Sequence, residues 1–383
     1  MHYTTAGESH GRVLTALVTG VPAGIPVEVA AIDHDLARRQ AGYGRGGRMA
    51  IETDRALITS GVRFGLTIGS PVAISVANRD WDNWLDVMAV CGPADPSARV
   101  TAPRPGHADL PGVLKTGSHD VRDVLERASA RETAARVAAG AIAKALLSCV
   151  GVSVRSFVVA IGDVAMEPPA DPSIVDSTAV DASDVRCPDA EAAERMRSAI
   201  DAARVDGESL GGVFVVTATG LVPGLGHYAE AGLRLDARLA AAVISIPAIK
   251  GVEFGDGFAV AARLGSQAHD AIHHDAARGF FRPTNHAGGL EGGMTNGEPL
   301  VVRAAMKPIP TLMRPLASVD IDTHEPVDAS RERSDVCAVP AAAVVAEAEV
   351  AFVLAAAYLE KFGTDAVDDI KGALAAYQAR LAR

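Results

Sequence analysis

The chain has 383 residues, of which 49% are hydrophobic and 22% are charged, so it can bury a large core and is not a disordered chain. Aspartate and glutamate outnumber lysine and arginine by 47 to 36, and the net charge of −11 argues against a nucleic-acid partner. The four cysteines, at positions 91, 149, 187 and 337, are too scattered for a disulfide scaffold or a metal site, which fits a reducing cytoplasm.

In chain order, seven short runs have the composition of strands, and most are bounded by glycine or proline. They cover residues 13–19, 26–31, 71–77, 152–161, 212–219, 243–246 and 300–305. These runs do not alternate with the predicted helices as regular βαβ units. The fold class is therefore predicted as α+β rather than a doubly wound parallel sheet.

Four segments are predicted to be helical. In the segment of residues about 129–149, apolar residues recur at helical spacing, and Ser129 and Glu132 have the spacing of a capping box. The segment 33–40 is ended by Gly42, and the segment about 340–361 begins at Pro340, a residue suited to a first helical position. The segments cover residues 33–40, about 129–149, about 190–203 and about 340–361.

The last of these helices lies in the most apolar stretch of the chain, residues 336–359. It contains Glu347 and Glu349, which a bilayer would tolerate poorly, so we expect a buried core helix and no membrane span. The N-terminus lacks a basic region followed by an apolar run, so no secretory signal is expected. Residues 166–206 are rich in Pro, Asp and Ser and are a candidate exposed insertion or boundary.

Four arginines, Arg38, Arg39, Arg45 and Arg48, fall within eleven residues, in a segment that also holds four glycines. Glycines allow backbone amides to approach a ligand, and guanidinium groups suit phosphate and carboxylate, so this loop predicts an anion site. The alternative is that the first two arginines only favour a helix C-terminus. A dinucleotide fingerprint is rejected, because these glycines follow a helix and lead into the strand-like residues 48–52.

Two further arginines precede the long helices. Arg131 would lie in a first turn, where a cation is unfavourable unless an anion docks at the open amides. It could equally be a solvated side chain paired with Glu126 or Glu132. Arg333 poses the same choice before the last helix, and Asp335 beside it is either a base or an ordinary cap.

Two of the eleven histidines have unusual settings. His10 is flanked by glycines, and His107 follows a turn with Arg104 and Asp109 within reach. Histidine suits proton transfer near neutral pH, although a lone histidine in a turn is more often structural. A glycine-rich run at 288–297 could bring backbone against a flat ligand or be an ordinary loop. The residues thus indicate an enzyme that binds a polyanion and uses histidine acid catalysis.

Taken together, these motifs resemble the chorismate synthase family. Residues 7–11, 126–140 (ERASARETAARVAAG) and 333–347 (RSDVCAVPAAAVVAE) are similar to its three signatures, and residues 104–109, 284–297 and 307–311 also fit, in the same order. The resemblance covers nearly the whole chain. It implies conversion of 5-enolpyruvylshikimate 3-phosphate to chorismate and phosphate, an anti 1,4-elimination that requires reduced FMN. It also implies a single domain (residues 1–383) with a β-α-β sandwich-like core, and a homotetramer.

The resemblance also implies a role for each matched residue. His10 would protonate reduced flavin or balance its charge, His107 would donate a proton to the departing phosphate, and Asp335 would accept a proton from flavin N5. Substrate would be bound by Ser9, Arg39, Arg45, Arg48, Arg104, Arg131 and Arg333. FMN would be bound by Arg127, Ala128, Ser129, Gln267, Ala268, Gly292, Lys307, Pro308, Ile309, Pro310, Thr311 and Arg333.

The source of reducing power stays open. Some descriptions of the family assign Arg39 and Arg45 to NADPH, but we interpret them first as phosphate ligands. Because no separate reductase domain is visible, we expect an external flavin reductase. The alternatives are a phosphate-handling enzyme that has lost its flavin site and a catalytically silent assembly protein. The intact His10, His107 and Asp335 argue against the latter.

Overall fold

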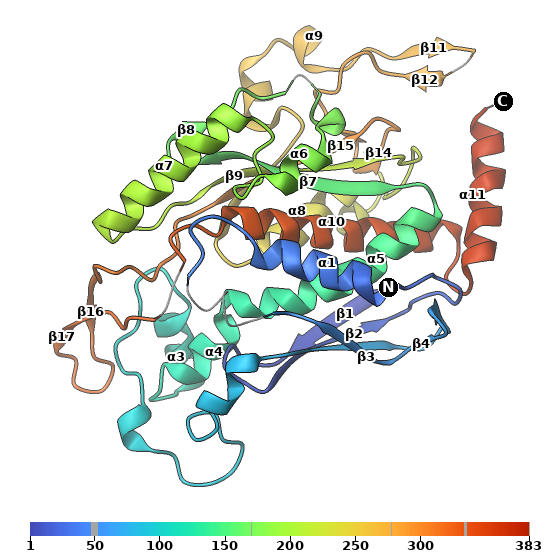
Figure 1. The fold of residues 1–383 in the computed structure, drawn as a ribbon. Helices are drawn as coiled ribbons and strands as arrows, with labels where there is room; N and C mark the ends of the chain where they lie inside the picture. Colours follow the sequence, from blue (N-terminus) through green and yellow to red (C-terminus); the bar gives the residue numbers. More distant parts are fainter. Residues whose placement is uncertain (47–52, 170, 277, 333–334, 383) are drawn as a thin grey trace.

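Two antiparallel sheets face each other across a layer of helices, and Figure 1 shows this three-layer arrangement. The computed structural model describes residues 1–46, 53–169, 171–276, 278–332 and 335–382. The first sheet has the order β1 (His2–Ala6), β2 (Val13–Thr19), β6 (Val72–Ala77) and β3 (Ala56–Ser60). The second has the order β10 (Ile249–Phe254), β15 (Leu300–Met306), β9 (Gly212–Thr219), β7 (Ser153–Ile161) and β8 (Val164–Ala165).

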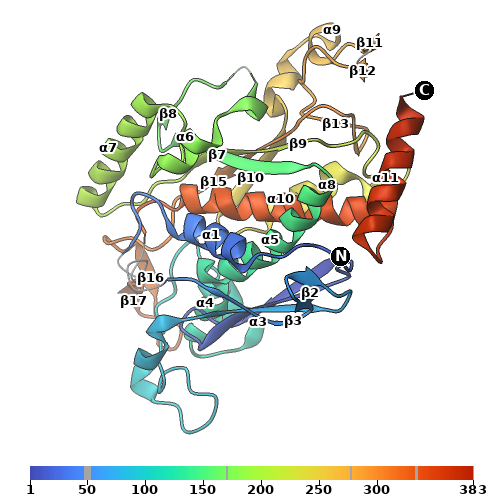
Figure 2. The ribbon, with the colours of Figure 1, turned by 45° about the vertical axis from the view of Figure 1, so that its right-hand side comes forward.

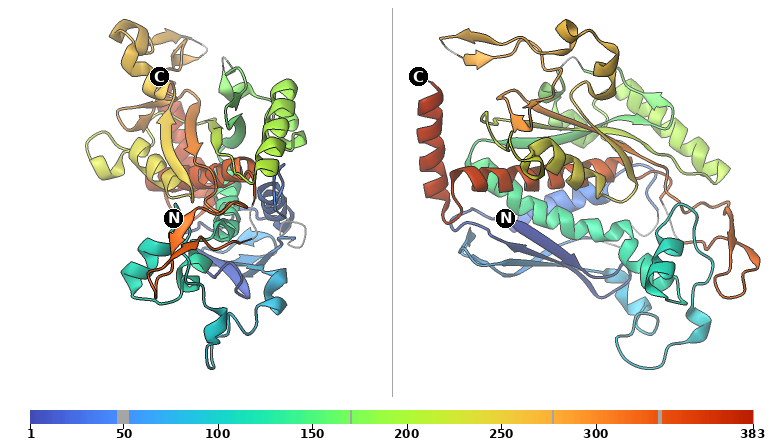
Figure 3. Two further views of the ribbon diagram at one scale, coloured as in Figure 1. Left: turned by 90° about the vertical axis from the view of Figure 1, so that its left-hand side faces the viewer. Right: turned by 180° about the vertical axis from the view of Figure 1, so that it is seen from behind.

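The helical layer consists of α1 (Val29–Gln40), α5 (Thr133–Cys149), α8 (Leu235–Ile244) and α10 (Val339–Phe362). Helix α5 packs on β2 and β6, whereas α10 packs on β7 and β9, so both sheets share one core. Figures 2 and 3 show α10 between the two sheets from three further directions. The predicted α+β class with antiparallel sheets and a helical layer is confirmed.

The remaining elements surround this core. They are β4 (Val62–Arg63), β5 (Leu66–Thr67), α3 (Asp109–Thr116), α4 (Arg122–Ala128), α6 (Ser177–Ala182), α7 (Ala190–Asp206), α9 (Gly265–Ala268), β11 (His273–Asp275), β12 (Gly279–Phe281), β13 (Leu290–Glu291), β14 (Met294–Thr295), β16 (Ala317–Val319), β17 (Pro326–Asp328) and α11 (Val367–Leu381). In Figure 1 the segment from α9 to β12 projects as an arm beyond the second sheet.

Strand alternation sets which face of the first sheet meets the helices. In β2 and β6 every second side chain is buried, as expected for a sheet with one covered face. The register places Leu14 opposite Val76 and Ala16 opposite Ile74, so buried residues pair directly across the two strands. The predicted strands at 13–19, 71–77, 152–161, 212–219 and 300–305 are confirmed within one residue at each end.

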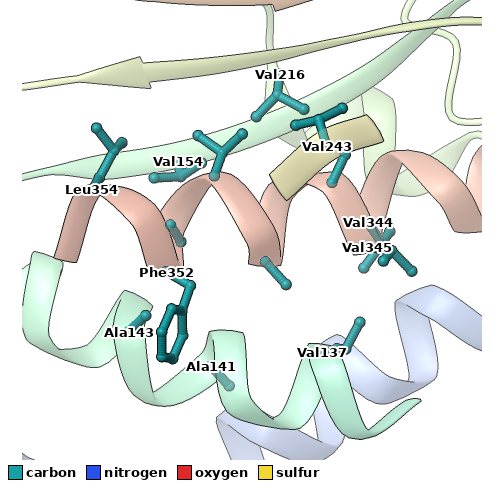
Figure 4. Close-up of a cluster of buried hydrophobic side chains, with 14 of the residues drawn as sticks. Val137, Ala141, Ala143, Val154, Val216, Val243, Val344, Val345, Phe352 and Leu354 are labelled. Atoms are coloured by element: carbon teal, nitrogen blue, oxygen red, sulfur yellow. The ribbon is translucent and has the colours of Figure 1, made fainter. Parts of the chain in front are cut away.

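Helix α10 is apolar on all sides because it is enclosed on all sides. It is long and apolar enough to cross a membrane, but 94% of its most apolar window is buried within the fold, so it is the predicted core helix. Figure 4 shows Phe352 pointing toward α5, and Val154 and Val216 reaching the helix from the sheet above. At the crossing of the two helices, Gly140 of α5 lies directly against Ala348 of α10.

Two predicted strands are wrong. Residues 26–31 lead into α1, which begins at Val29, and residues 243–246 lie at the end of α8. In α8 the buried residues Leu235, Leu239 and Val243 recur every four positions, so the helical period decides the structure. A short apolar run could not show that period, since it is too brief to separate a strand from a buried helix turn.

Two further sequence expectations are modified, and a third is not tested by the structure. Residues 166–206, a candidate exposed insertion, supply Val185, Met196 and Ile200 to the main core. The capping box does not form, because Ser129 accepts from the backbone N–H of Arg131 in a 3-10 turn and α5 begins only at Thr133. The strand-like residues 48–52 lie outside the described residues.

The close crossing of α5 and α10 yields a stability prediction. A Cβ added at Gly140 would lie 2.3 Å from the Cβ of Ala348, so Gly140→Ala should destabilise the fold by about 2 kcal/mol through overpacking. Gly372→Ala in α11 is the matched control, because that position is exposed, has no neighbour within 4 Å and should gain up to about 1 kcal/mol. Denaturant unfolding of both variants measures the difference, and equal stabilities would contradict the packing argument.

Two buried carboxylates on α10 have opposite electrostatic settings. Glu347 accepts hydrogen bonds from Arg38, Lys144 and Ser156. Burial alone would raise the pKa of Glu347, but Lys144 and Arg38 outweigh burial and hold it well below its usual range. For Glu349 burial dominates and raises the pKa, although Tyr3 donates to it at 2.5 Å.

These two settings predict opposite mutational effects. Because the folded-state pKa of Glu347 lies below the unfolded value near 4.3, its stabilisation is fully present at pH 7 and is lost as the pH falls below about 4. Glu347→Gln should therefore cost about 3 kcal/mol at pH 7 and less in acid. Glu349→Gln should be nearly neutral at pH 7, since the fold already favours the uncharged form. The free energy of unfolding of both variants is measured between pH 3 and pH 7. Equal changes in stability for the two variants would refute the prediction.

Candidate functional site

A cavity of about 470 Å³ lies at the end of the helical layer where the C-terminus of α1 meets the N-termini of α5 and α10, at the left of Figure 1. Both N-termini carry partial positive charge, which favours anions at this end of the layer. The predicted site residues that line the cavity are Ser9, His10, Arg39, Arg45, Arg104, His107, Ala128, Ser129, Arg131, Lys307, Ile309, Pro310, Thr311 and Asp335.

The first predicted catalytic histidine is held by a buried carboxylate. The Nδ1 atom of His10 lies 2.9 Å from Glu126 of α4, which also accepts from the His10 backbone N–H. The imidazole stacks on Trp84 at a centroid distance of 3.8 Å. Burial alone would raise the pKa of Glu126, but hydrogen bonding and charge from His10 and Arg122 outweigh burial and lower it. The histidine ring is thus fixed by a carboxylate that stays ionised.

The second predicted histidine has the same kind of partner. His107 Nδ1 lies 2.5 Å from Asp109, which is fully buried at the start of α3. Arg104 donates to the same carboxylate through Nε and Nη2. Burial would raise the pKa of Asp109, yet the hydrogen bonds from His107 and Arg104 hold it well below its usual range. Among the described residues, Nε2 of His107 has no partner, so this nitrogen is available to a ligand.

Two buried guanidinium groups share one carboxylate at the wall of the cavity. Arg131 pairs with Asp54 at 2.7 Å, and Arg39 lies 3.6 Å from the same carboxylate. In the described part of the chain, the buried Nη1 of Arg39 has no hydrogen-bond partner, while Nε donates to Thr133 at 3.0 Å. Burial, reinforced by the charge of Arg131, lowers the pKa of Arg39 to about 9. Among the described residues, these two guanidinium groups thus meet at one carboxylate and leave one buried donor of Arg39 unsatisfied, which favours an anion here.

Two predicted site residues contact each other directly. Arg45 pairs with Asp335 at 2.7 Å, and the other oxygen of this carboxylate accepts from the backbone N–H of Gly46 at 2.6 Å. The glycine loop is held close to this segment because Val336 donates its backbone N–H to Gly44. The expected phosphate ligand and the expected base thus lie on two segments joined side by side, although they are separated by 290 positions in the sequence.

Much of the remaining lining of the cavity is apolar. It includes Leu125, Ile246, Pro247, Ala248, Met306, Ile309, Pro310, Ala338, Ala341, Ala342 and Val345. Lys307 also lines the cavity and donates to the carbonyl of Gly106. A cavity lined by both guanidinium groups and apolar side chains fits a flat, aromatic, phosphate-bearing cofactor together with an anionic substrate. The residues present therefore fit FMN.

Several predicted residues lie elsewhere. Arg127 is on the outer side of α4 and donates to the carbonyls of Thr5 and Gly7. Gln267 and Ala268 are in α9 on the projecting arm, Gly292 is in the turn between β13 and β14, and Pro308 does not line the cavity although its neighbours do. Arg48 and Arg333 fall outside the described residues. Among the residues described, no cluster of histidine, cysteine and carboxylate side chains is arranged to hold a metal ion.

Sequence reasoning missed four residues that organise the site, namely Asp54, Asn78, Trp84 and the carboxylate of Glu126. Each lies far in sequence from its partner, so no local spacing could have revealed it. The alternative pairing of Arg131 with Glu126 or Glu132 is not what the structure shows, because Arg131 pairs with Asp54.

Fold and cavity together are those expected of an enzyme for an anionic ligand, with guanidinium groups and two carboxylate-held histidines in one cavity. A sequence model of the family described as chorismate synthase matches residues 1–359. The chain therefore belongs to the chorismate synthase family, and as such it is a lyase that eliminates phosphate.

Individual relatives agree with the family match. The chain is 57% identical to the chorismate synthase of Symbiobacterium thermophilum, with all of both chains covered, and 59% identical to that of Moorella thermoacetica, with 99% and 98% covered. A crystal structure of a chorismate synthase is similar with a TM-score of 0.81 and 42% identity, over 100% of this chain and 98% of the other.

The unsatisfied Arg39 donor predicts a separation of stability from binding. Arg39→Met removes a buried cation whose carboxylate partner, Asp54, is 3.6 Å away. The melting temperature should therefore stay the same or rise. Affinity for an anionic ligand should fall at least about tenfold, because a charge-assisted hydrogen bond is lost. Differential scanning calorimetry and titration calorimetry with inorganic phosphate measure both effects. A large drop in melting temperature would show that Arg39 is structural.

Proposed function

We propose that this cavity converts 5-enolpyruvylshikimate 3-phosphate to chorismate and phosphate by anti 1,4-elimination, the last common step of the shikimate pathway. Family membership makes the chain a phosphate-eliminating lyase. The observation that carries the assignment to this cavity is the pair of buried arginines with a single shared carboxylate, beside two histidines that are each held by a carboxylate. Such an arrangement supplies a site for a polyanion and two positioned proton donors.

The substrate's anionic groups would be bound by Ser9, Arg39, Arg45 and Arg131, with Arg48 and Arg333 completing the set. The unsatisfied Nη1 of Arg39 supports this role most directly. Arg104 has a different part in the proposal. Its Nη2 donates to Asp109 and lies 3.0 Å from Nδ1 of His107, so it would orient His107.

The proton steps are assigned to three side chains. With Asp109 on Nδ1, His107 would donate the proton on Nε2 to the departing phosphate. His10, held by Glu126 against Trp84, would supply a proton or a counter-charge to the reduced cofactor. Asp335 would accept a proton at its carboxylate once the substrate draws Arg45 away from it. The two histidine–carboxylate pairs keep each ring in one orientation, which general acid catalysis requires.

Reduced FMN is the proposed cofactor. When bound, it supplies electron density transiently, which eases loss of an allylic phosphate without net oxidation or reduction. The chain would hold it with Ala128, Ser129, Lys307, Ile309, Pro310 and Thr311, all of which line the cavity, together with Pro308 and Arg333. The apolar side of the cavity would exclude water from the reacting face of the bound molecules.

We assign Arg127, Gln267, Ala268 and Gly292 to the flavin site of a homotetramer, in which a second copy would bring distant residues to the cavity. The arm supports an interface, because Phe258, Leu264, Ile272 and Phe280 are each more than 60% exposed on or beside it. Such a concentration of exposed apolar side chains is typical of an association surface. An external flavin reductase in the cytoplasm would provide reducing power, with NADPH at Arg39 and Arg45 as the alternative.

The decisive experiment is an anaerobic assay of phosphate release from 5-enolpyruvylshikimate 3-phosphate, with and without dithionite-reduced FMN. Phosphate and chorismate should appear in equal amounts and only when reduced FMN is present. Turnover without flavin would favour a flavin-independent enzyme, and no turnover under any condition would contradict the proposal. Repeating the assay with NADPH in place of dithionite tests whether the chain reduces its own flavin.

His107→Ala provides a sharper test of one assignment. Loss of a general acid should lower kcat by about 10²-fold or more, while FMN affinity stays within about twofold of the wild type. His286→Ala is the control, because His286 pairs with Asp256 outside the cavity. Stopped-flow measurement of single turnovers separates chemistry from binding. Full activity in His107→Ala would remove this residue from the mechanism.

A further inference from the structure

Asp54 is buried at the cavity wall, and its side chain is inaccessible to solvent. It follows α1 in the chain, and its backbone N–H donates to Gln40 at 3.0 Å. Its carboxylate pairs with both terminal nitrogens of Arg131, at 2.7 Å each, and lies 3.6 Å from Arg39. No motif of the family resemblance includes Asp54, and it does not itself line the cavity.

Asn78 completes the environment of the same guanidinium. Its side-chain oxygen accepts from Nε of Arg131 at 2.9 Å, and its side-chain amide donates to the carbonyls of Gly11 and Glu8 at 2.6 and 3.2 Å. Asn78 is only 4% exposed. Asn78 therefore links Arg131 to the turn that carries His10. It contacts Nε of the guanidinium, whereas Asp54 contacts the two terminal nitrogens.

In the part of the chain that the structure describes, Asp54 lies between two buried cations. Two guanidinium groups, those of Arg39 and Arg131, are buried against one carboxylate, and the backbone carbonyl of Arg131 accepts a weak hydrogen bond from Arg39 at 3.5 Å. Without Asp54, two buried cations would repel each other across a region of low dielectric. With Asp54 between them, they can lie side by side in the lining of the cavity.

We propose that Asp54 is the positioning residue that joins Arg39 and Arg131 into one anion-binding unit, and that Asn78 sets the orientation of this unit relative to His10. The identity of the anion rests on the proposed function, whereas the arrangement itself does not. Asp54 touches no ligand and acts only through the two arginines. A negatively charged residue thus strengthens the binding of an anion, because it orients the cations more than it neutralises them.

The test compares Asp54→Asn with the wild type. Titration calorimetry with 5-enolpyruvylshikimate 3-phosphate should show a dissociation constant raised about tenfold or more, since Arg131 loses its paired acceptor. FMN fluorescence quenching should show flavin affinity unchanged within about twofold. Equal or tighter substrate binding by Asp54→Asn would overturn the proposal, because it would mean that the charge of Asp54 only opposes the anion.

Asp33→Asn is the matched control. Asp33 also pairs with an arginine, Arg55, and accepts from the backbone of Ala56 in the same segment, but it does not line the cavity. Its substitution should leave both affinities unchanged. A comparable loss of substrate affinity in Asp33→Asn would assign the effect to a disturbed segment and overturn the positioning role.

A double-mutant cycle keeps the inference testable if Asp54→Asn folds poorly. In an Arg131→Met background, Asp54→Asn should weaken binding by no more than about twofold further, because the principal partner of Asp54 is already gone. Additive losses in the cycle would contradict the proposal. Inorganic phosphate is titrated in parallel. Failure of the wild type to bind 5-enolpyruvylshikimate 3-phosphate would refute the proposed function, while the inference would still be decided by the effect of Asp54→Asn on phosphate binding.

Discussion

The site depends on burying several guanidinium groups at one end of a layer of helices. Isolated cations in a protein interior are strongly unfavourable, so each guanidinium must have a fixed partner. The fold supplies these partners from separate segments: Asp54 for Arg131, Asp335 for Arg45 and Asp109 for Arg104. Arg39 lies 3.6 Å from the carboxylate of Asp54, which is too far for a hydrogen bond. It is therefore the group whose free donor a bound anion would satisfy.

The same device appears twice around the histidines. In each case a buried carboxylate contacts Nδ1 of the histidine and also pairs with an arginine. Glu126 contacts His10 and Arg122, and Asp109 contacts His107 and Arg104. The carboxylate fixes the ring, and the hydrogen bond from the histidine, followed by the arginine, lowers the pKa of each carboxylate despite its burial. The two pairs are built from unrelated segments, so the repetition does not come from a repeated sequence; in the proposed mechanism both rings would be positioned proton donors.

The sequence predicted the parts of this molecule that have a local signal. The helix 340–361 was predicted correctly, because its apolar segment is too long for a strand and Pro340 suits a first helical position. Short apolar runs were not, and residues 26–31 and 243–246 are helical or lead into a helix. Among the site residues, Asp109 could be associated with His107 because two positions separate them, whereas Glu126 is 116 positions from His10. Pairing of that kind is set by tertiary packing, which no single sequence displays.

The crossing of α5 and α10 has a mechanical consequence for the cavity. Gly140 and Ala348 touch in mid-helix, and each helix then runs seven residues, about 10 Å, to the end that lines the cavity, at Thr133 and Ala341. A change in the angle between the two helices at this contact would move both helix ends. A change of only about 5° would displace each end by about 1 Å, a shift large enough to misalign reacting groups. The close contact at Gly140 would therefore affect how the two helix ends are aligned at the cavity.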